Sequence, residues 1–518
     1  MNSMPDQLLS LVPESLQQTV SNYWQDWSGA CEKAGAGPQV ELSEMGKVWA
    51  CSEFVARQCI RWPGMLSELA GEGFAAARSA DDYQQLVAQS IAAAEPTDEG
   101  LMCALRMLRQ KEMVRIAWRD LAGFAEVEQV LHELSDFAEA VISRTLDHLY
   151  QQSTVSLGVP MNAHGEAQQM LVLAMGKLGG RELNYSSDID LIFAYAEEGS
   201  TEGGRRLSNH EFFLRLARQL VRALDEITSE GFVFRVDTRL RPNGDSGPLA
   251  MNLNAMEQYY QLQGRDWERY AMIKARIIAG KEADRKQLAS MLQPFTYRRY
   301  LDFGAFESIR EMKGMIEAEM RRKGMKNNIK LGKGGIREIE FIGQTFQLIR
   351  GGPMPELQVR SILKVLSLLA RLGYLEQAEA DKLSTSYLYL RRLENRLQME
   401  RYQQTQTLPL DELSRERIRL GMGVADWDSL MQELDQHRQA VSQVFDSVIS
   451  SDEQRETDSI HALQLFWSDI ENNESLSHWL VEAGCDNVEE ILDVLARFRS
   501  CLLYTSPSPR DCNEYLVC

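Results

Sequence analysis

The stretch LVLAMGKLGGRELNYSSDIDLIFAY, residues 171–195, decides the fold that we expect for this chain. It joins two apolar runs through a glycine-containing turn and ends in an Asp-x-Asp pattern. Residues two apart on a strand point to the same side, so Asp188 and Asp190 share one face while Ile189 and Leu191 face the core. Two neighbouring carboxylates repel each other unless a cation lies between them, and Mg2+ prefers oxygen ligands beside substrate phosphates. The stretch therefore predicts a metal-dependent site for phosphoryl or nucleotidyl transfer.

Length and composition indicate a globular protein of several domains. The chain has 518 residues, of which 44% are hydrophobic and 25% charged, and a formal net charge of −19. At roughly 150 residues per domain, three or four domains are expected. The acidic balance argues against a protein that coats nucleic acid or anionic membrane, and no basic groove interleaved with aromatic residues is evident. We therefore expect neither nucleic acid nor membrane as a partner.

The expected location is the cytoplasm. The first residues, MNSMPDQLLSLVPE, lack the basic and apolar segments of a signal peptide, and no apolar run approaches the ~18 residues of a membrane span. The eight cysteines form no CxxC pair, so neither a zinc site nor a disulfide framework is predicted. Buried free thiols in a reducing compartment are the expectation.

The periodicity of apolar residues divides the chain into five parts. The fold class is α+β and predominantly helical, with a small α/β core flanked by helical domains. The expected parts are an N-terminal helical domain (1–155), the core (156–304), a C-terminal helical domain (305–450), the start of a linker or regulatory helical region (451–500) and a non-native tail (501–518). The tail resembles a translated cloning or sequencing-adapter sequence, and a native disordered tail is the alternative.

The helical domains show apolar residues at helical spacing. In the first, the expected helices are Val48–Ile60, Leu101–Leu121 and Val127–Tyr150, and this domain offers no chemistry. In the second, they are Ala305–Arg322, Ile336–Ile349, Val359–Leu372, Asp381–Tyr402 and Trp427–Ile449. A polar stretch, Ser450–Thr457, then leads toward further helices.

The core is expected to run strand, turn, strand, helix, strand. The strands are Met170–Met175, Ile189–Tyr195 and Phe232–Leu240, and the helix is Leu207–Ser229. An apolar stripe on this helix is ready to cover the sheet. It comprises Phe213, Leu216, Leu220, Leu224 and Ile227.

The third strand supplies a third acid, Asp237. In period-2 counting it shares a face with Arg235, Arg239 and Arg241. A solvent-facing edge strand is the alternative explanation. Three carboxylates can hold two metal ions on either side of a phosphate, and neighbouring arginines can bind phosphate oxygens. The glycines of the turn would let backbone amides approach a phosphate.

A basic segment in this acidic chain is a candidate phosphate seat. Arg310–Arg337 holds nine Lys or Arg against three Glu, and Lys330 and Lys333 precede the helix expected at Ile336–Ile349. A helix N-terminus with glycines favours an anion, although a solvated helix face and an ordinary loop remain the alternative. Trp267-Glu268-Arg269 and Lys274-Ala275-Arg276 could contact nucleotide or simply pair charges on the flank of the core.

The order of glycine turn, Asp-x-Asp and later Asp resembles the polymerase β-type nucleotidyltransferase superfamily. Lys177 departs from that general pattern, in which Ser or Gly is usual. The longer segments GKLGGRELNYSSDIDLIF, FRVDTRLRPNGDSGPL, GRDWERYAMIKARIIAG, KLGKGGIREIEF and RRLENRLQM resemble the bifunctional glutamine synthetase adenylyltransferase/adenylyl-removing family, in the right order from about Ser43 to Ile449. Lys177 is part of the GKLGG motif that is typical of that family.

Family members carry two nucleotidyltransferase halves, and one Asp-x-Asp core is present here. The resemblance therefore implies the N-terminal, adenylyl-removing half with the start of the following region, truncated at its C-terminal end. It implies phosphorolysis of adenylyl-tyrosine on glutamine synthetase, giving ADP, with Mg2+, in two ions, as cofactor. It also implies regulation by a PII signalling protein and by glutamine. ATP-dependent adenylylation by the same fold, or a degenerate regulatory module, are the alternatives.

The expected site has two sets of residues. The catalytic and metal-binding residues are Asp188, Asp190 and Asp237. The residues expected to contact nucleotide or phosphate are Gly176, Lys177, Gly179, Gly180, Ser187, Arg239, Arg241, Lys274, Arg276, Lys330 and Lys333. None of the histidines lies in a motif, so none is given a role.

Overall fold

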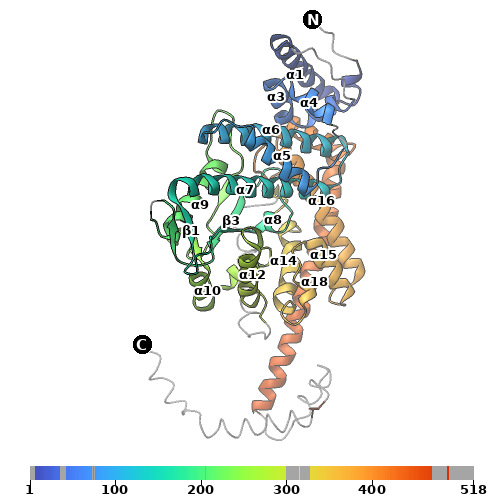
Figure 1. Ribbon diagram of the computed structural model, residues 1–518. Helices are drawn as coiled ribbons and strands as arrows, with labels where there is room; N and C mark the ends of the chain where they lie inside the picture. The colour runs from blue at the N-terminus through green and yellow to red at the C-terminus, as the bar shows by residue number, and fades with distance from the viewer. Residues whose placement is uncertain are drawn as a thin grey trace. The chain divides into compact units, whose positions relative to one another are not determined.

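The computed structural model is mostly helical and contains a small mixed sheet (Figure 1). It describes residues 6–35, 43–72, 74, 76–204, 206–298, 314, 327–468 and 487–488. Contacts divide the chain into a unit Met1–Ser442 and a unit Gln443–Cys518, and the sheet lies in the first. The predicted fold class, α+β and predominantly helical, is confirmed.

The described part of residues 1–155 contains helices only, as predicted. They are η1 (Asp6–Leu9), α1 (Glu14–Lys33), α2 (Met45–Cys51), α3 (Glu53–Arg61), α4 (Met65–Glu72), α5 (Ala80–Ala92), α6 (Asp98–Ala122) and α7 (Val127–Leu157). The single helix predicted at Val48–Ile60 is wrong, because Ser52 ends α2 and caps α3 by accepting a hydrogen bond from the Val55 amide. A capping side chain that satisfies a free amide favours a new helix start over a continuous helix.

The core follows as short strands separated by helices. Its elements are β1 (Val159–Met161), β2 (Met170–Ala174), α8 (Gly176–Gly179), β3 (Ile189–Tyr195), β4 (Ser200–Glu202), α9 (Asn209–Asp225), β5 (Val236–Asp237), η2 (Gly244–Ser246), β6 (Ala250–Asn252), α10 (Leu253–Leu262), α11 (Asp266–Met272), β7 (Arg276–Ala279) and α12 (Glu282–Thr296). The main sheet has the order β5-β3-β2-β7, with β6 also paired to β3. β2 runs antiparallel to β3 and β7, whereas β5 and β6 run parallel to β3.

Both faces of the central strands are buried, which explains their continuous apolar runs. One face of β2 and β3, with Val172 and Leu191, packs into a core shared with α7 and α9. The other face, with Leu173 and Ile192, packs on residues of α10 and α12. In the view of Figure 1, α7 runs above the sheet and α12 below it. This enclosure fixes the strand end at which Asp188 and Asp190 lie.

The strand predicted at Phe232–Leu240 is only two residues long, Val236–Asp237. On its N-terminal side, the amides of Val233 and Phe234 donate to the Leu224 carbonyl at the end of α9. On its C-terminal side, the Arg239 amide donates to Asp237 Oδ1 at 2.8 Å, which turns the chain. Arg239 and Arg241 therefore do not share a strand face with Asp237.

The predicted helix Leu207–Ser229 is shorter than expected. It is α9, which begins after the cap Ser208 and ends at Asp225. Four residues of its predicted stripe are buried in the core. Ile227, the fifth, lies beyond the helix and is 78% exposed.

The helices after residue 327 mostly match their predictions. They are α14 (Ile336–Arg350), η4 (Pro355–Leu357), α15 (Ile362–Arg371), α16 (Gln377–Arg401), α17 (Glu412–Met422) and α18 (Trp427–Ser468). The polar stretch Ser450–Thr457 lies within α18. The helix predicted at Ala305–Arg322 and the tail 501–518 lie outside the described residues.

Two further expectations concern the described part of the chain. No helix there is long and apolar enough to cross a membrane. Cys31, Cys51 and Cys59 are buried free thiols, as predicted, whereas Cys103 is exposed.

Candidate active site

Two predicted acids lie side by side in the sheet. In the parallel pairing of β3 with β5, Asp190 is in register with Asp237. Adjacent strands are separated by about 4.8 Å, which brings the two carboxylates within reach of one cation. Asp188 directly precedes β3 and is partly exposed like Asp190, while Ile189 between them is buried. The alternation predicted for Asp-x-Asp is therefore confirmed.

Asp190 lies in an environment that opposes its negative charge. Burial, together with the charges of Asp237 and Asp188, raises the pKa of its carboxyl to about 6. Lys330 and Arg239 act in the opposite direction but do not cancel the effect. A carboxylate crowded by two others is stabilised by a bound cation.

The neighbouring acids are held by arginines. Arg235 Nε donates to Asp188 Oδ1 at 2.6 Å, and Gln404 Nε2 donates to Asp188 Oδ2 at 3.2 Å. Arg239 Nη2 lies 2.5 Å from Asp237 Oδ2, and this hydrogen bonding lowers the pKa of Asp237. Among the described residues, no group of three or more His, Cys, Asp or Glu side chains is arranged so that it could hold a metal ion.

The donor chemistry of the three acids still fits Mg2+. Asp190 and Asp237 are in register on adjacent strands, and the raised pKa of Asp190 reflects its burial and the negative charges of the other two acids. All three side chains offer the oxygen atoms that Mg2+ prefers.

Asp190→Asn is expected to stabilise the fold at neutral pH without divalent cations. A raised native pKa means that ionised Asp190 destabilises the native state above about pH 6, and this penalty fades as the pH falls toward the unfolded-state value near 4. The variant should gain about 1–2 kcal/mol in the free energy of unfolding at about pH 7.5, since partial hydration reduces the full effect. Urea unfolding at about pH 7.5 and pH 5 measures this gain. A variant less stable than the parent at the higher pH would contradict it.

The glycine turn between β2 and β3 closes on Asp190. It forms α8, and Gly176 has a φ of 53°, a backbone conformation that side chains disfavour. A Cβ atom on Gly176 would lie 2.9 Å from Asp190 Oδ2. At Gly179 a Cβ atom would lie 2.0 Å from the carbonyl oxygen of Lys274, so this glycine permits a close approach of backbone rather than of ligand. Gly180 lies beside Glu182.

Lys177 and Ser187 flank the acids differently. The Nζ atom of Lys177 donates to Asn184 Oδ1 at 2.8 Å and to Glu394 Oε1 at 2.9 Å. Although burial opposes ionisation, Lys177 and Arg391 hold the pKa of Glu394 below its usual range. Ser187 is partly exposed directly before Asp188. The side chain of Lys177 is thus bound within the protein, whereas Ser187 remains partly accessible.

The basic residues predicted after the turn mostly pair within the protein. Arg241 is buried and donates to the carbonyls of Thr238 at 2.8 Å and Gly247 at 3.3 Å. Arg276 pairs with Glu139 and donates to the Gly179 carbonyl at 3.1 Å. These contacts favour a structural role for both arginines. For Arg276, they agree with the alternative that it pairs charges on the flank of the core.

Lys274 is the centre of a buried ion-pair cluster. Its Nζ atom lies 2.9 Å from Glu182 Oε2 and 2.6 Å from Glu340 Oε1. Burial opposes the positive charge of Lys274, but these carboxylates outweigh that effect and raise the pKa of Lys274 well above its usual range. In Trp267-Glu268-Arg269, the buried Arg269 lies 3.1 Å from Asp266, which likewise favours charge pairing.

At the start of α14, where an anion site is predicted, the backbone amides have acceptors within the protein. The amides of its first three residues donate to carbonyls: Ile336 to Ile329, Arg337 to Lys330 and Glu338 to Gly335. Amides that already have acceptors offer no cradle for a phosphate. The Lys330 side chain is near enough to lower the pKa of Asp190, and Lys333 is exposed. Most of Arg310–Arg337 before residue 327 lies outside the described residues.

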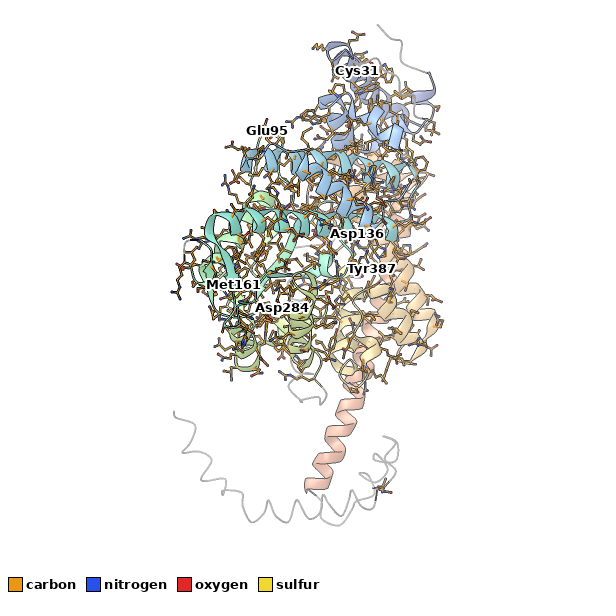
Figure 2. All side chains as sticks on the ribbon, viewed as in Figure 1. Cys31, Glu95, Asp136, Met161, Asp284 and Tyr387 are labelled. Atoms are coloured by element: carbon orange, nitrogen blue, oxygen red, sulfur yellow. The ribbon has the colours of Figure 1, made fainter. Side chains whose placement is uncertain are left out.

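The segment between the turn and the acids is held from two sides. Arg181 forms an ion pair with Asp136 of α7, which is labelled in Figure 2. On the other side, α16 contributes contacts that sequence reasoning missed. They come from Glu394, Asn395 and Gln398, and Gln404 follows just after the helix. A sequence signal for these contacts was present in RRLENRLQM, where polar residues that are buried in the structure interrupt the apolar pattern of a helix.

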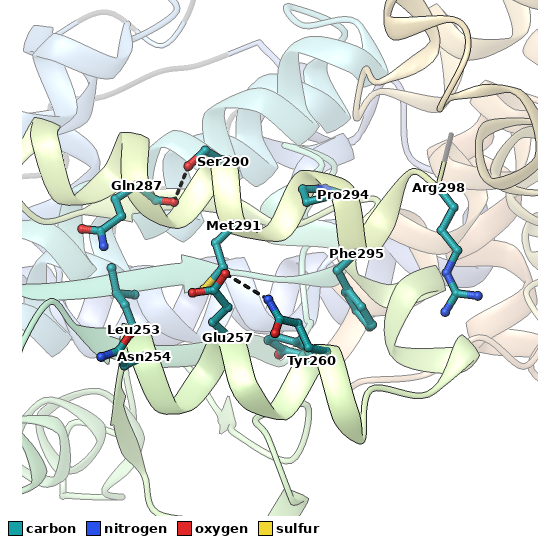
Figure 3. Close-up of a pocket in the computed structure, with 11 residues that line it drawn as sticks. Leu253, Asn254, Glu257, Tyr260, Gln287, Ser290, Met291, Pro294, Phe295 and Arg298 are labelled. Carbon is teal, nitrogen blue, oxygen red and sulfur yellow. Dashed lines mark hydrogen bonds between the residues drawn. The ribbon is translucent and has the colours of Figure 1, made fainter. Parts of the chain in front are cut away.

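A separate cavity lies between α10 and α12 (Figure 3). It has a volume of about 530 Å³, and its lining includes Glu257, Tyr260, Ser290 and Phe295. None of the residues predicted for the site lines it. The acids, and not this cavity, are the candidate active site.

Comparison with known proteins gives two family matches and close relatives. Residues 42–291 match the family described as glutamate-ammonia ligase adenylyltransferase, and residues 310–449 match the family described as GlnD PII-uridylyltransferase. The chain is 51% identical over 464 residues to a bifunctional glutamine synthetase adenylyltransferase/adenylyl-removing enzyme of Nitrosococcus oceani, covering 88% of this chain and 48% of that protein. It is 43% identical over 508 residues to the protein of the same name from Thioalkalivibrio sulfidiphilus, covering 96% of this chain and 52% of that protein.

The chain thus spans about half the length of the curated relatives that it matches. The first family match covers the acids, the glycine turn and β5, and the second covers α14 to α17. The resemblance predicted from the sequence motifs is confirmed. The chain belongs to the family of bifunctional glutamine synthetase adenylyltransferase/adenylyl-removing enzymes.

Proposed function

We propose that this chain carries the adenylyl-removing site and catalyses the phosphorolysis of adenylyl-tyrosine on glutamine synthetase. The observation that carries the proposal is the register of Asp190 with Asp237 beside Asp188, at the strand end that follows the glycine turn. The printed names of its relatives include both adenylyltransferase and adenylyl-removing activity. The removal direction rests on the resemblance of this chain to the N-terminal half of the family.

The reaction exchanges one phosphorus–oxygen bond for another. An oxygen of inorganic phosphate attacks the phosphorus of the adenylyl group, the bond to the tyrosyl oxygen breaks, and ADP forms. The tyrosyl oxygen leaves as a phenolate and takes a proton, which is favourable because the pKa of a phenol is about 10. Two anions must meet in this step, so neutralisation of charge is the main task of the site.

The residues of the site divide this task. Asp188, Asp190 and Asp237 would hold Mg2+, in one or two ions, which supplies positive charge to the phosphate oxygens when bound. Arg239, whose side chain is 74% exposed, and Lys330 are placed to add positive charge on the protein side. Ser187 offers a hydroxyl group directly before Asp188. Phosphate and ADP are the expected small substrates and products.

Glutamine synthetase is the proposed protein substrate, and a PII signalling protein and glutamine are the proposed regulators, in the cytoplasm. The match of residues 310–449 to a PII-uridylyltransferase family supports a link to PII signalling. ATP-dependent adenylylation by the same site is the second candidate, because the relatives are named for both activities.

The decisive assay incubates adenylylated glutamine synthetase and Mg2+ with the chain, with and without inorganic phosphate. ADP should appear only when phosphate is present, because phosphate is the attacking group. Unmodified glutamine synthetase with ATP serves as the parallel reaction for the second candidate. Release of AMP without phosphate, or no release of nucleotide at all, would contradict phosphorolysis.

A further inference from the structure

The segment Asn184–Ser187, which leads into Asp188, depends on a distant helix for its position. It is not part of a strand or helix, yet Asn184, Tyr185 and Ser186 are buried. A buried irregular segment needs hydrogen-bond partners for its backbone. These partners come from α16, some 210 residues further along the chain.

Gln398 of α16 is the central partner. Its Oε1 atom accepts hydrogen bonds from the Ser186 amide and from Asn184 Nδ2, both at 2.7 Å. The side chain of Gln398 is fully buried. One oxygen thus accepts from a buried backbone donor and a buried side-chain donor. Leaving either donor without an acceptor would destabilise the fold.

Two neighbours on α16 hold the adjoining parts of the same segment. Asn395 Oδ1 accepts from the Tyr185 amide at 3.2 Å, and Glu394 binds Lys177 of the glycine turn. Glu394, Asn395 and Gln398 are called the α16 clamp below. Arg391, one turn earlier, donates to the Glu182 carbonyl at 2.6 Å and to the hydroxyl of Tyr387, which is labelled in Figure 2, at 2.7 Å. Tyr387 lies in α16 itself, so the contact with the Glu182 carbonyl is the one that ties the helix to the segment before Asn184.

The clamp lies where a positional error would matter most. Ser186 is two residues before Asp188 and four before Asp190, and Lys177 follows Gly176, where an added Cβ atom would lie 2.9 Å from Asp190 Oδ2. A displacement of this segment moves the acids relative to Asp237 on β5. Side chains that orient ligand residues typically change activity by about 10- to 100-fold when altered.

We propose that Gln398 is a positioning residue for the reaction, setting Asp188 and Asp190 through the hydrogen bonds of its Oε1 atom to Ser186 and Asn184. The inference rests on the proposed function for its catalytic consequence. It assigns a catalytic contribution to α16, which belongs to the part of the chain that matches the PII-uridylyltransferase family and not the adenylyltransferase family. The reacting groups therefore depend on both matched regions.

The test compares Gln398→Met with Gln398→Glu in the full chain. Methionine keeps the size of the side chain but removes the acceptor, whereas glutamate keeps an oxygen for both donors. We expect Gln398→Met to lower kcat for ADP release about tenfold, with KM for adenylylated glutamine synthetase within about twofold. Gln398→Glu should restore most of kcat. Gln403→Met, at an exposed glutamine just beyond the helix, is the matched control and should leave kcat unchanged.

Amide hydrogen exchange provides a readout that does not require activity. In Gln398→Met, exchange should rise in peptides that contain residues 184–190, because the Ser186 amide loses its acceptor, while exchange in α7 stays at the parental level. An unchanged kcat, a general rise of exchange across the chain, or failure of Gln398→Glu to restore kcat would overturn the positioning role. An inactive parent chain would instead refute the proposed function, and the exchange of residues 184–190 would still decide whether Gln398 holds this segment.

Discussion

Asp190→Asn should lower turnover about 1000-fold while the chain remains folded. Asp190 is in register with Asp237, and burial, together with the charges of Asp237 and Asp188, raises its pKa to about 6. Asparagine keeps the shape of the side chain but removes the charge that would hold Mg2+. A loss of several kcal/mol in transition-state stabilisation is expected from the loss of one such ligand.

The measurement is ADP release at saturating phosphate over a range of Mg2+ concentrations. Asp245→Asn, at an exposed carboxylate in η2, is the matched control and should retain parental activity. Circular dichroism and urea unfolding report the fold of each variant. Substantial turnover by Asp190→Asn at any Mg2+ concentration would show that Asp190 is not a metal ligand.

Gly176→Ala should lower kcat about 100-fold through a misplaced acid. Gly176 has a φ of 53°, and an added Cβ atom would lie 2.9 Å from Asp190 Oδ2. That distance is too short for a carbon and an oxygen, so the carboxylate must move away. The left-handed backbone adds a cost of about 1 kcal/mol in the free energy of unfolding.

Gly165→Ala separates these two effects. Gly165 also has a positive φ, 76°, but an added Cβ atom meets nothing within 4 Å. It should lose a similar amount of stability and keep parental kcat. If Gly165→Ala and Gly176→Ala lowered kcat equally, the contact with Asp190 would not be the cause.

Several sequence motifs meet in one buried charge network beside the acids. Lys177 pairs with Glu394, and Lys274 pairs with Glu182 and Glu340. These side chains come from the glycine turn, the segment before β7, α14 and α16. Buried ion pairs contribute little net stability but impose a specific geometry when every member has a partner. Their role here is better described as fixing the frame of the site than as binding nucleotide.

The sequence alone determined the local features of this protein. Period-2 alternation placed Asp188 and Asp190 on one face, because adjacent side chains on a strand point to opposite sides of the sheet. Helical periodicity located most helices, and Gly176 marked a turn that side chains disfavour. Five quoted segments were enough to indicate the family, which relatives at 43% and 51% identity confirm.

Only the tertiary structure decided which residues meet at the site. The register of Asp190 with Asp237 depends on the pairing of β3 with β5, which are separated by α9 in the sequence. Lys274 has buried acidic partners, and the amides at the start of α14 have carbonyl acceptors. Both groups are therefore already paired within the protein. Gln398 reaches Ser186 from a helix 212 residues away. Partners so distant along the chain leave no periodic signal, because their contact is set by packing between elements and not by the spacing of residues within one.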